Sequence, residues 1–188
     1  AAISKKAVSA TVSAADKVYN GNTAAIVTIT YSDLVGSETL TTASSSATFS
    51  DQNAEINKTV TVNSIALGDG DNGGLAANYS VTTGQTTLAT ISKAPLSVTG
   101  MNTTVTYNAS AQTSEAATIL GTQGSDSFVI SGYATATNYS AVAYADDLSV
   151  TSAAINNYDI TYTNGSLTII KAPLSVTGMN TTVTYNAS

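Results

Sequence analysis

The residues of this sequence that could do chemistry are few and scattered. Histidine and cysteine are both absent, which removes nucleophiles paired with a histidine base and metal sites built on thiolates. The neighbouring carboxylates Asp146 and Asp147 are poor partners for acid–base work, because adjacent residues of a strand point to opposite faces. We therefore expect no catalytic residue and predict that the protein is not an enzyme.

One acidic loop has the composition of a cation site. Asp69, Asp71 and Asn72 lie in an Asp-Gly-Asp-Asn-Gly-Gly stretch that is rich in oxygen ligands and in glycine, as calcium loops are. The later bidentate glutamate of an EF-hand is missing. Calcium at these three residues is the one cofactor that we consider, and a polar connection leading to Asn78 is the competing interpretation.

Lysine and tyrosine side chains suggest two further hypotheses. Lys93 or Lys171 could form an isopeptide crosslink with an asparagine, which requires a buried lysine beside the asparagine and a carboxylate. A solvated lysine is the alternative at both positions. Exposed tyrosines such as Tyr133 and Tyr139 could bind glycans from a host or from the environment, whereas tyrosines of a small sandwich more often belong to the core with the hydroxyl at its rim.

The elements that must position these residues are organised by an internal repeat. Residues 93–110 and 171–188 are identical, and weaker matches join the starts and the ends of two longer units. Self-similarity of this kind indicates a repeat array. The matching segments are 93–110 with 171–188, 3–5 with 91–93, 18–21 with 106–109, and 78–82 with 157–161.

We therefore predict two complete repeats, 1–92 and 93–170, and the opening of a third at 171–188. The sequence begins without methionine and stops inside a repeat, so we expect an excerpt of a longer polypeptide whose first partners are neighbouring repeats. The opening segment would have to pack on the preceding unit, fray, or pair with another chain through an open edge.

The junctions between units are short. Lys93 and Pro95 mark the first junction, and Lys171 and Pro173 mark the second. Proline fixes φ and lacks a donor, so it suits the start of a strand. A junction of this length between folded units favours a stiff joint over a flexible linker.

Alternating residues predict strands throughout. Val, Ile, Thr and Tyr are abundant, and no helical periodicity is sustained. Segments 158–163 and 166–170 flank Asn164-Gly165, which predicts a type I′ hairpin; segments 79–83 and 87–92 predict a similar closing hairpin. We expect an all-β fold of tandem small immunoglobulin-like β-sandwiches in a linear array, with β-grasp-like units as the alternative.

Composition excludes two classes of partner. Only 10% of the residues are charged, the net charge is −6, and the few cations include no arginine. Binding to nucleic acid by counterion release needs clustered basic residues, so we exclude it. No apolar run approaches the roughly 20 residues that span a bilayer, so we expect no membrane span in this segment.

Three motifs carry a resemblance to known families. They are Val-Tyr-Asn-Gly-Asn-Thr-Ala at 18–24, Asn-Tyr-x-Val at 78–81 and Ile-x-Lys-Ala-Pro-Leu-x-Val at 91–98. The first repeat resembles the YDG repeat of bacterial surface proteins and the second repeat resembles the mostly-β glycine-rich (MBG) repeat. Ala109 stands where the first repeat has Gly21, so the resemblance does not specify the turn type at that point.

Such repeats occur in large secreted adhesins and filamentous-haemagglutinin-like proteins. The resemblance implies an extracellular location at the bacterial cell surface and a structural role in adhesion or biofilm, as a stalk or filament segment, and it supplies no catalytic residue. Two alternatives remain open. One is an extracellular fibre that assembles from other copies by strand exchange, and the other is an adhesive module that binds glycans directly.

Overall fold

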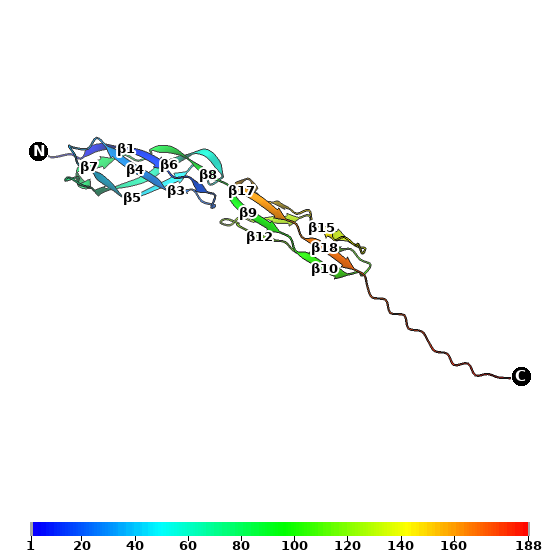
Figure 1. The fold of residues 1–188 in the computed structure, drawn as a ribbon. Coiled ribbons are helices and arrows are strands. Elements are labelled where there is room, and N and C mark those ends of the chain that lie inside the picture. The colour runs from blue at the N-terminus through cyan, green and yellow to red at the C-terminus, as the bar shows by residue number, and fades with distance from the viewer. Residues whose placement is uncertain (1, 188) are drawn as a thin grey trace. The chain divides into compact units, whose positions relative to one another are not determined.

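The computed structural model describes residues 2–187, and they form an all-β protein (Figure 1). The predicted fold class is confirmed at this level. The two helical elements are single 3-10 turns, η1 (Ala76–Asn78) and η2 (Ile155–Asn157). No helix within residues 2–187 is long and apolar enough to cross a bilayer.

Contacts divide the chain into two compact units. Unit 1 comprises Ala1–Val98, Ile119–Ile130 and Val150–Tyr162, and unit 2 comprises Thr99–Thr118, Ser131–Ser149 and Thr163–Ser188. Unit 1 therefore contains the first sequence repeat together with part of the second. The predicted boundaries 1–92, 93–170 and 171–188 follow sequence similarity rather than contacts, and they stay a prediction.

The largest sheet of unit 1 has five strands in the order β2-β8-β6-β5-β3. Its centre is the antiparallel pair β5 and β6, which runs from Leu40 opposite Asp69 to Phe49 opposite Val60. Alternation buries Val60 and Val62 completely, as expected for a sheet with one covered face. The strands are β2 (Lys17–Val18), β3 (Ala24–Ala25), β5 (Leu40–Phe49), β6 (Glu55–Asp69) and β8 (Thr86–Ser92).

A second sheet of unit 1 has the order β4-β1-β7, with β1 (Lys6–Ala14), β4 (Val27–Ser32) and β7 (Tyr79–Val81). Strand β1 is antiparallel to β4 and parallel to β7. The predicted hairpin of 79–83 with 87–92 is wrong, because β7 joins this sheet and β8 joins the five-stranded sheet. In their separate sheets Tyr79 and Ile91 are only 2% and 1% exposed. The free energy gained by this burial outweighs that of a local hairpin between the two segments.

The five-stranded sheet and the β4-β1-β7 sheet contribute to one hydrophobic core. Phe49, Val60 and Ile91 come from the five-stranded sheet, and Val12 and Val27 from the other. The same core continues into residues of the second repeat that belong to unit 1. Those residues are Ala94, Leu96 and Tyr158, with the partly buried Ile119, Phe128, Ala154 and Ile160 packed against them.

The strands of the second repeat form small sheets with the orders β12-β9-β17, β13-β16, β10-β18-β15 and β11-β14. Within unit 2, Leu167 and Ile169 of β18 are buried against Ala134. The strand bounds are β9 (Ala94–Thr99), β10 (Asn102–Thr106), β11 (Gln112–Thr113), β12 (Thr118–Leu120), β13 (Val129–Ser131), β14 (Thr135–Ala136), β15 (Tyr144–Ala145), β16 (Ser149–Thr151), β17 (Tyr158–Thr163) and β18 (Ser166–Ile170).

The predicted hairpin at Asn164-Gly165 is also wrong. β17 lies beside β9, and β18 lies between β10 and β15. Neither Asn164 nor Gly165 has the positive φ that a type I′ turn requires. Glycine is needed at 165 for another reason: a Cβ there would lie 2.2 Å from the carbonyl oxygen of Met101. Close backbone packing, rather than a hairpin turn, uses this glycine.

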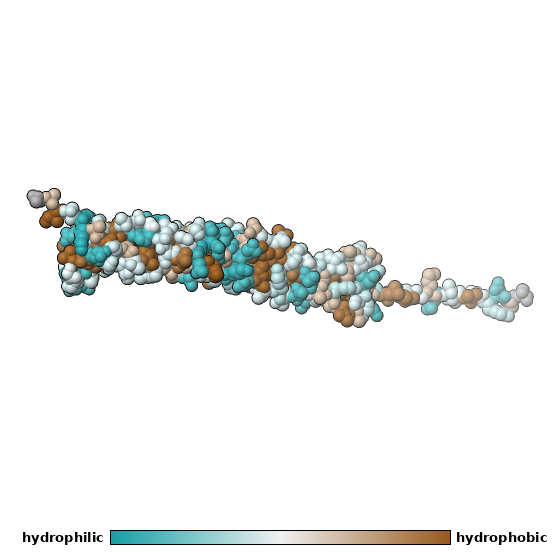
Figure 2. All heavy atoms as spheres, turned by 90° about the horizontal axis from the view of Figure 1, so that it is seen from above, coloured by the Kyte–Doolittle hydropathy of each residue, from teal (hydrophilic) through white to brown (hydrophobic). Residues whose placement is uncertain are grey.

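Residues 171–187 form no strand and are exposed, and the segment bears apolar side chains (Figures 1 and 2). The identical residues 93–110 include strands β9 and β10. Leu96 and Val98 of β9 are 1% and 0% exposed, whereas Leu174 and Val176 are 89% and 86% exposed. The same local sequence thus takes two states, so tertiary partners rather than local propensity decide whether it forms a strand.

Candidate functional site

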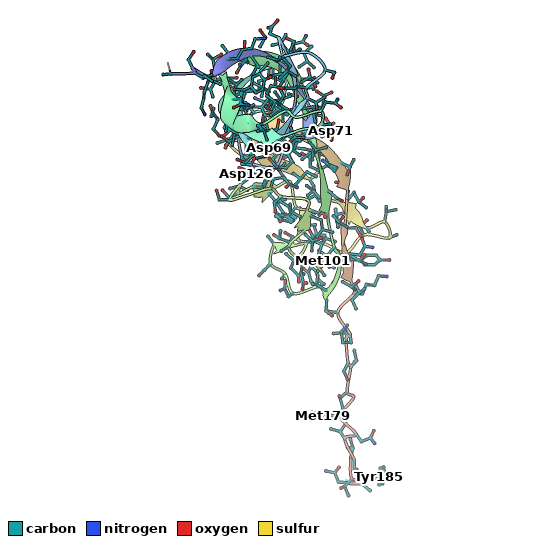
Figure 3. The ribbon with its side chains drawn as sticks, turned by 90° about the vertical axis from the view of Figure 1, so that its left-hand side faces the viewer. Asp69, Asp71, Met101, Asp126, Met179 and Tyr185 are labelled. Atoms are coloured by element: carbon teal, nitrogen blue, oxygen red, sulfur yellow. The ribbon has the colours of Figure 1, made fainter. Side chains whose placement is uncertain are left out.

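The acidic loop uses its polar groups for internal hydrogen bonds. Asp69 accepts from the backbone amide of Ala76 at 2.8 Å, and the side-chain amide of Asn72 donates to the carbonyl of Ser37 at 2.9 Å. Figure 3 labels Asp69 and Asp71 in this part of unit 1. No group of three or more acidic, histidine or cysteine side chains that could hold a metal is found within residues 2–187. Calcium at Asp69, Asp71 and Asn72 stays a prediction.

The junction residues alternate between core and solvent. Lys93 and Pro95 are exposed, while Ala94 and Leu96 between and after them are buried. Lys171 and Pro173 are exposed as well. A crosslink of the proposed kind requires a buried lysine, which neither junction provides. The isopeptide hypothesis is therefore wrong for Lys93 and Lys171.

The buried lysine of unit 1 is Lys58, which is 4% exposed. Its ammonium lies 2.8 Å from Asp51 and 3.1 Å from Glu55. Burial alone would lower the pKa of Lys58, but the two carboxylates offset it and the pKa is raised; the hydrogen bond from Lys58 lowers the pKa of Asp51. Sequence reasoning missed this site, although Lys58 shares the strand phase of the buried Val60 and Val62.

Two buried tyrosines from different repeats meet on one carboxylate. The Tyr19 hydroxyl donates to Asp126 at 2.9 Å and the Tyr158 hydroxyl donates to the same oxygen at 2.7 Å. The rings of Tyr19 and Tyr158 pack edge to face with centroids 5.4 Å apart, and Phe128 packs on Tyr158 at 5.1 Å. We call Tyr19, Asp126 and Tyr158 the joint triad.

The environment keeps both phenols of the joint triad protonated. Burial, followed by the hydrogen bond to Asp126, raises the pKa of Tyr158 to about 12. The same two causes raise the pKa of Tyr19. A phenolate at either position would face the Asp126 carboxylate without enough water, so the neutral phenol is favoured.

Backbone and amide contacts extend the joint on either side of the triad. The amide nitrogen of Tyr19 donates to the carbonyl of Ser92 at 2.8 Å. Asn157, which is 4% exposed, accepts from the backbone amide of Ala54 at 2.8 Å and donates to the side chain of Asn53 at 3.2 Å. The Asn157 contacts join the 53–54 loop of the first repeat to the second repeat within unit 1, whereas the Tyr19 contact lies inside the first repeat.

The buried carboxylate of Asp146 stabilises unit 2. It accepts from the Ser114 hydroxyl at 2.6 Å, the Ala134 amide at 2.8 Å and the Gly165 amide at 3.1 Å. Its neighbour Asp147 is exposed, so the two carboxylates face apart, as the alternation predicts. Three donors satisfy Asp146, and its role here is structural.

The tyrosines considered for glycan binding differ in exposure. Tyr133 is half-buried and its hydroxyl accepts from the amide of Ala117 at 3.3 Å. Tyr139 is 47% exposed, and the ammonium of Lys171 lies 4.8 Å from its ring centre. Of these two tyrosines, Tyr133 takes part in local structure and Tyr139 presents part of its ring to solvent.

The joint triad places one half-buried carboxylate between two buried phenols. A carboxylate that accepts from two phenols has no nucleophile or base within this set to activate, and its geometry serves to hold elements together. Tyr19 and Tyr158 lie in the repeated Tyr-Asn and Asn-Tyr motifs of the sequence, but sequence reasoning did not single them out as site residues. Asp126 lies in a stretch without a repeat signal, so sequence reasoning missed it.

A YDG domain is found at residues 4–88, which confirms the predicted identity of the first repeat. It includes Tyr19, Lys58 and Tyr79, whereas Asp126 and Tyr158 lie beyond it. No curated protein and no solved structure shows a significant match to the chain. The MBG resemblance of the second repeat stays a prediction.

Proposed function

We propose that this chain is a structural stalk or filament segment of an extracellular bacterial surface protein involved in adhesion. In this proposal, tandem units of the immunoglobulin-like sandwich type, the first YDG and the second MBG, hold other parts of the protein away from the cell. The observation that carries it is the joint triad, because it fastens the YDG domain to the repeat that follows.

The joint has the properties of a connection that resists mechanical force. Its two phenols are buried and bonded to one carboxylate, and the core of the YDG domain continues through Ala94 and Leu96. A flexible linker would leave these groups in water. Such a joint resists bending, because bending would separate Tyr19 from Asp126 and expose apolar surface.

The composition agrees with use outside the cell. Cysteine is absent and only 10% of residues are charged, so solubility rests on Ser, Thr and Asn. Interactions of such a surface depend little on ionic strength, since few surface charges are available for salt to screen.

Two experiments test the proposal. Antibodies against the chain should label intact cells of the source bacterium, and protease added outside should remove the epitope; an epitope protected until lysis would contradict the location. In single-molecule stretching, Tyr19→Phe should lower the force at which the joint opens, whereas Tyr162→Phe, an exposed tyrosine of the same unit, should not. Equal opening forces would show that the Tyr19 contact does not contribute to the mechanical strength of the joint.

A second candidate function is assembly into a fibre by strand exchange, and the exposed segment 171–187 favours it. This segment has the sequence that forms β9 and β10 at 93–106, and its apolar side chains, including Met179 and Tyr185, lie away from any strand (Figure 3). A chain trimmed to 1–170 should then lose polymerisation in electron micrographs and light scattering. Fibres that persist after trimming would show that the segment is not the donor strand.

A further inference from the structure

A pair made of a tyrosine and a carboxylate occurs twice in unit 1 with the same connectivity. At the joint, the amide of Gln123 donates to the Tyr158 hydroxyl at 2.8 Å and that hydroxyl donates to Asp126. In the YDG domain, the amide of Val35 donates to the Tyr79 hydroxyl at 3.2 Å and that hydroxyl donates to Glu38. In both pairs the amide lies three residues before the carboxylate.

The two pairs differ in what completes them. Asp126 also accepts from Tyr19 of the preceding repeat. Beside Glu38 there is a pocket of about 440 Å³ instead. Its lining includes Ile3 at the start of the chain, Val35 and Glu38 of one loop, and Asn78 and Tyr79.

Residues that are covered at the joint are bare at the pocket. Ile91 is 1% exposed in the core, whereas Ile3, which has the corresponding place in the repeat, is 100% exposed. Asn157 is buried and bonded to the 53–54 loop of the first repeat. Its counterpart Asn78 is exposed and lines the pocket.

Unit 2 contains Tyr107, which lies in the same backbone setting as Tyr19. The amide of Tyr107 donates to the carbonyl of Ile170 at 2.9 Å, as the amide of Tyr19 donates to Ser92 at 2.8 Å. Strand β10 is parallel to β18, as β2 is parallel to β8. The Tyr107 side chain is 39% exposed, whereas Tyr19 in the joint is 1% exposed.

We propose that the pocket beside Glu38 is the docking site for the Tyr-Asn end of another repeat joined directly in front of Ile3. Its tyrosine donates to Glu38 as Tyr19 donates to Asp126, and its last strand continues into Ile3, which is then buried as Ile91 is. The recognised chemistry is a phenol followed by an asparagine, presented beside a strand that runs into Ile3. This inference rests on the tandem-repeat part of the proposed function.

The test uses a doubled chain, in which residues 1–168 are followed directly by 3–188. This fusion keeps the repeat register, because Ile3 then takes the place of Ile169. Tyr107 of the first copy should dock beside Glu38 of the second. The amide of the internal Ile3 should become protected from hydrogen exchange, and Tyr107→Phe in the first copy should reduce that protection about tenfold to a hundredfold, as expected for losing a hydrogen bond to a charged group.

A double-mutant cycle assigns the effect to the contact. With Glu38→Gln in the second copy, Tyr107→Phe should have a much smaller effect, since the charged acceptor is gone. The control cycle pairs Tyr19→Phe with Asp126→Asn at the existing joint. Coupling at the existing joint without coupling at Glu38 would overturn this inference and leave the proposed function standing, and coupling at neither would overturn both.

The unmodified chain tests whether the docking tyrosine comes from the same polypeptide or from a second copy. The proposal expects a monomer in sedimentation velocity at concentrations up to those used for exchange. Association of single chains that Tyr107→Phe abolishes would assign the pocket to a second copy, and would overturn a docking site that serves a repeat on the same polypeptide.

Discussion

Replacing Asp126 by alanine should destabilise unit 1 more than any other change to one exposed or half-buried carboxylate. The variant leaves two buried phenols without their acceptor. Tyr158 still accepts from the amide of Gln123 at 2.8 Å, but the proton of each hydroxyl loses its partner. Tyr19, at 1% exposure, has little access to water as a replacement.

The magnitude follows from the two hydrogen bonds. A hydrogen bond to a charged group contributes about 1.5–3 kcal/mol, and an unsatisfied buried donor costs about 1–3 kcal/mol. Asp126 is half-buried, so water can enter the space that alanine leaves and reduce the cost. We expect a loss of about 2–4 kcal/mol in the free energy of unfolding, or a fall in Tm of about 4–16 °C at a scale of roughly 2–4 °C per kcal/mol for a chain of this size.

Urea denaturation followed by circular dichroism and by tyrosine fluorescence measures this change, since the chain has no tryptophan. Tyr162→Phe, at an exposed position of β17, is the matched control and should change stability by less than about 0.5 kcal/mol. Tyr19→Phe should have a smaller effect in the Asp126→Ala background than in the native chain. Additive effects, or an Asp126→Ala variant as stable as the control, would refute the joint triad.

Three further outcomes are expected. Leu96→Ala should cost about 2–5 kcal/mol because Leu96 is buried, while Leu174→Ala in the identical segment should be neutral in the same melts; equal effects would contradict the two environments. Gly165→Ala should destabilise by at least about 1–3 kcal/mol, because a Cβ would overlap the Met101 carbonyl, and a neutral result in urea would contradict that packing. Because the pKa of Tyr158 is raised to about 12 from about 10 unfolded, its stabilisation is complete below pH 10 and is lost as pH rises to about 12. Absorbance at the phenolate band during alkaline titration should therefore show late ionisation, which Asp126→Asn moves to lower pH.

The sequence was sufficient for the fold class and for the identity of the first repeat. Alternating Val, Ile, Thr and Tyr predict strands by a period that needs no tertiary information, and the Val-Tyr-Asn-Gly motif at 18–21 lies within the YDG domain at 4–88. The same alternation places Lys58 in phase with Val60 and Val62, so its burial was readable in principle.

Strand partners were not predictable from local signals. The Asn164-Gly165 pair favours a hairpin locally, yet Gly165 is needed where the backbone passes Met101 and donates to Asp146. Residues 171–187 show the same limit, since a sequence identical to that of β9 forms no strand there. In each case long-range packing decides the outcome, and a single sequence without aligned relatives does not contain that information.

Two of the three joint-triad residues lie in repeated motifs of the sequence. Tyr19 and Tyr158 stand in repeated motifs, but the carboxylate that unites them does not, because Asp126 pairs with residues 107 and 32 positions away. The match between Glu38 and Asp126 emerged only once both tyrosine pairs were seen in three dimensions. A short acidic side chain in a loop carries no pattern of its own.

Residual dipolar couplings of backbone amides test the central claim most directly. The claim is that the joint triad fixes the YDG domain to the part of the second repeat that belongs to unit 1. Couplings from residues 6–92 and from residues 119–130 and 150–162 should fit one alignment tensor, and Asp126→Ala should make the two sets diverge. Two different tensors in the native chain would show that the joint is flexible and would contradict the account.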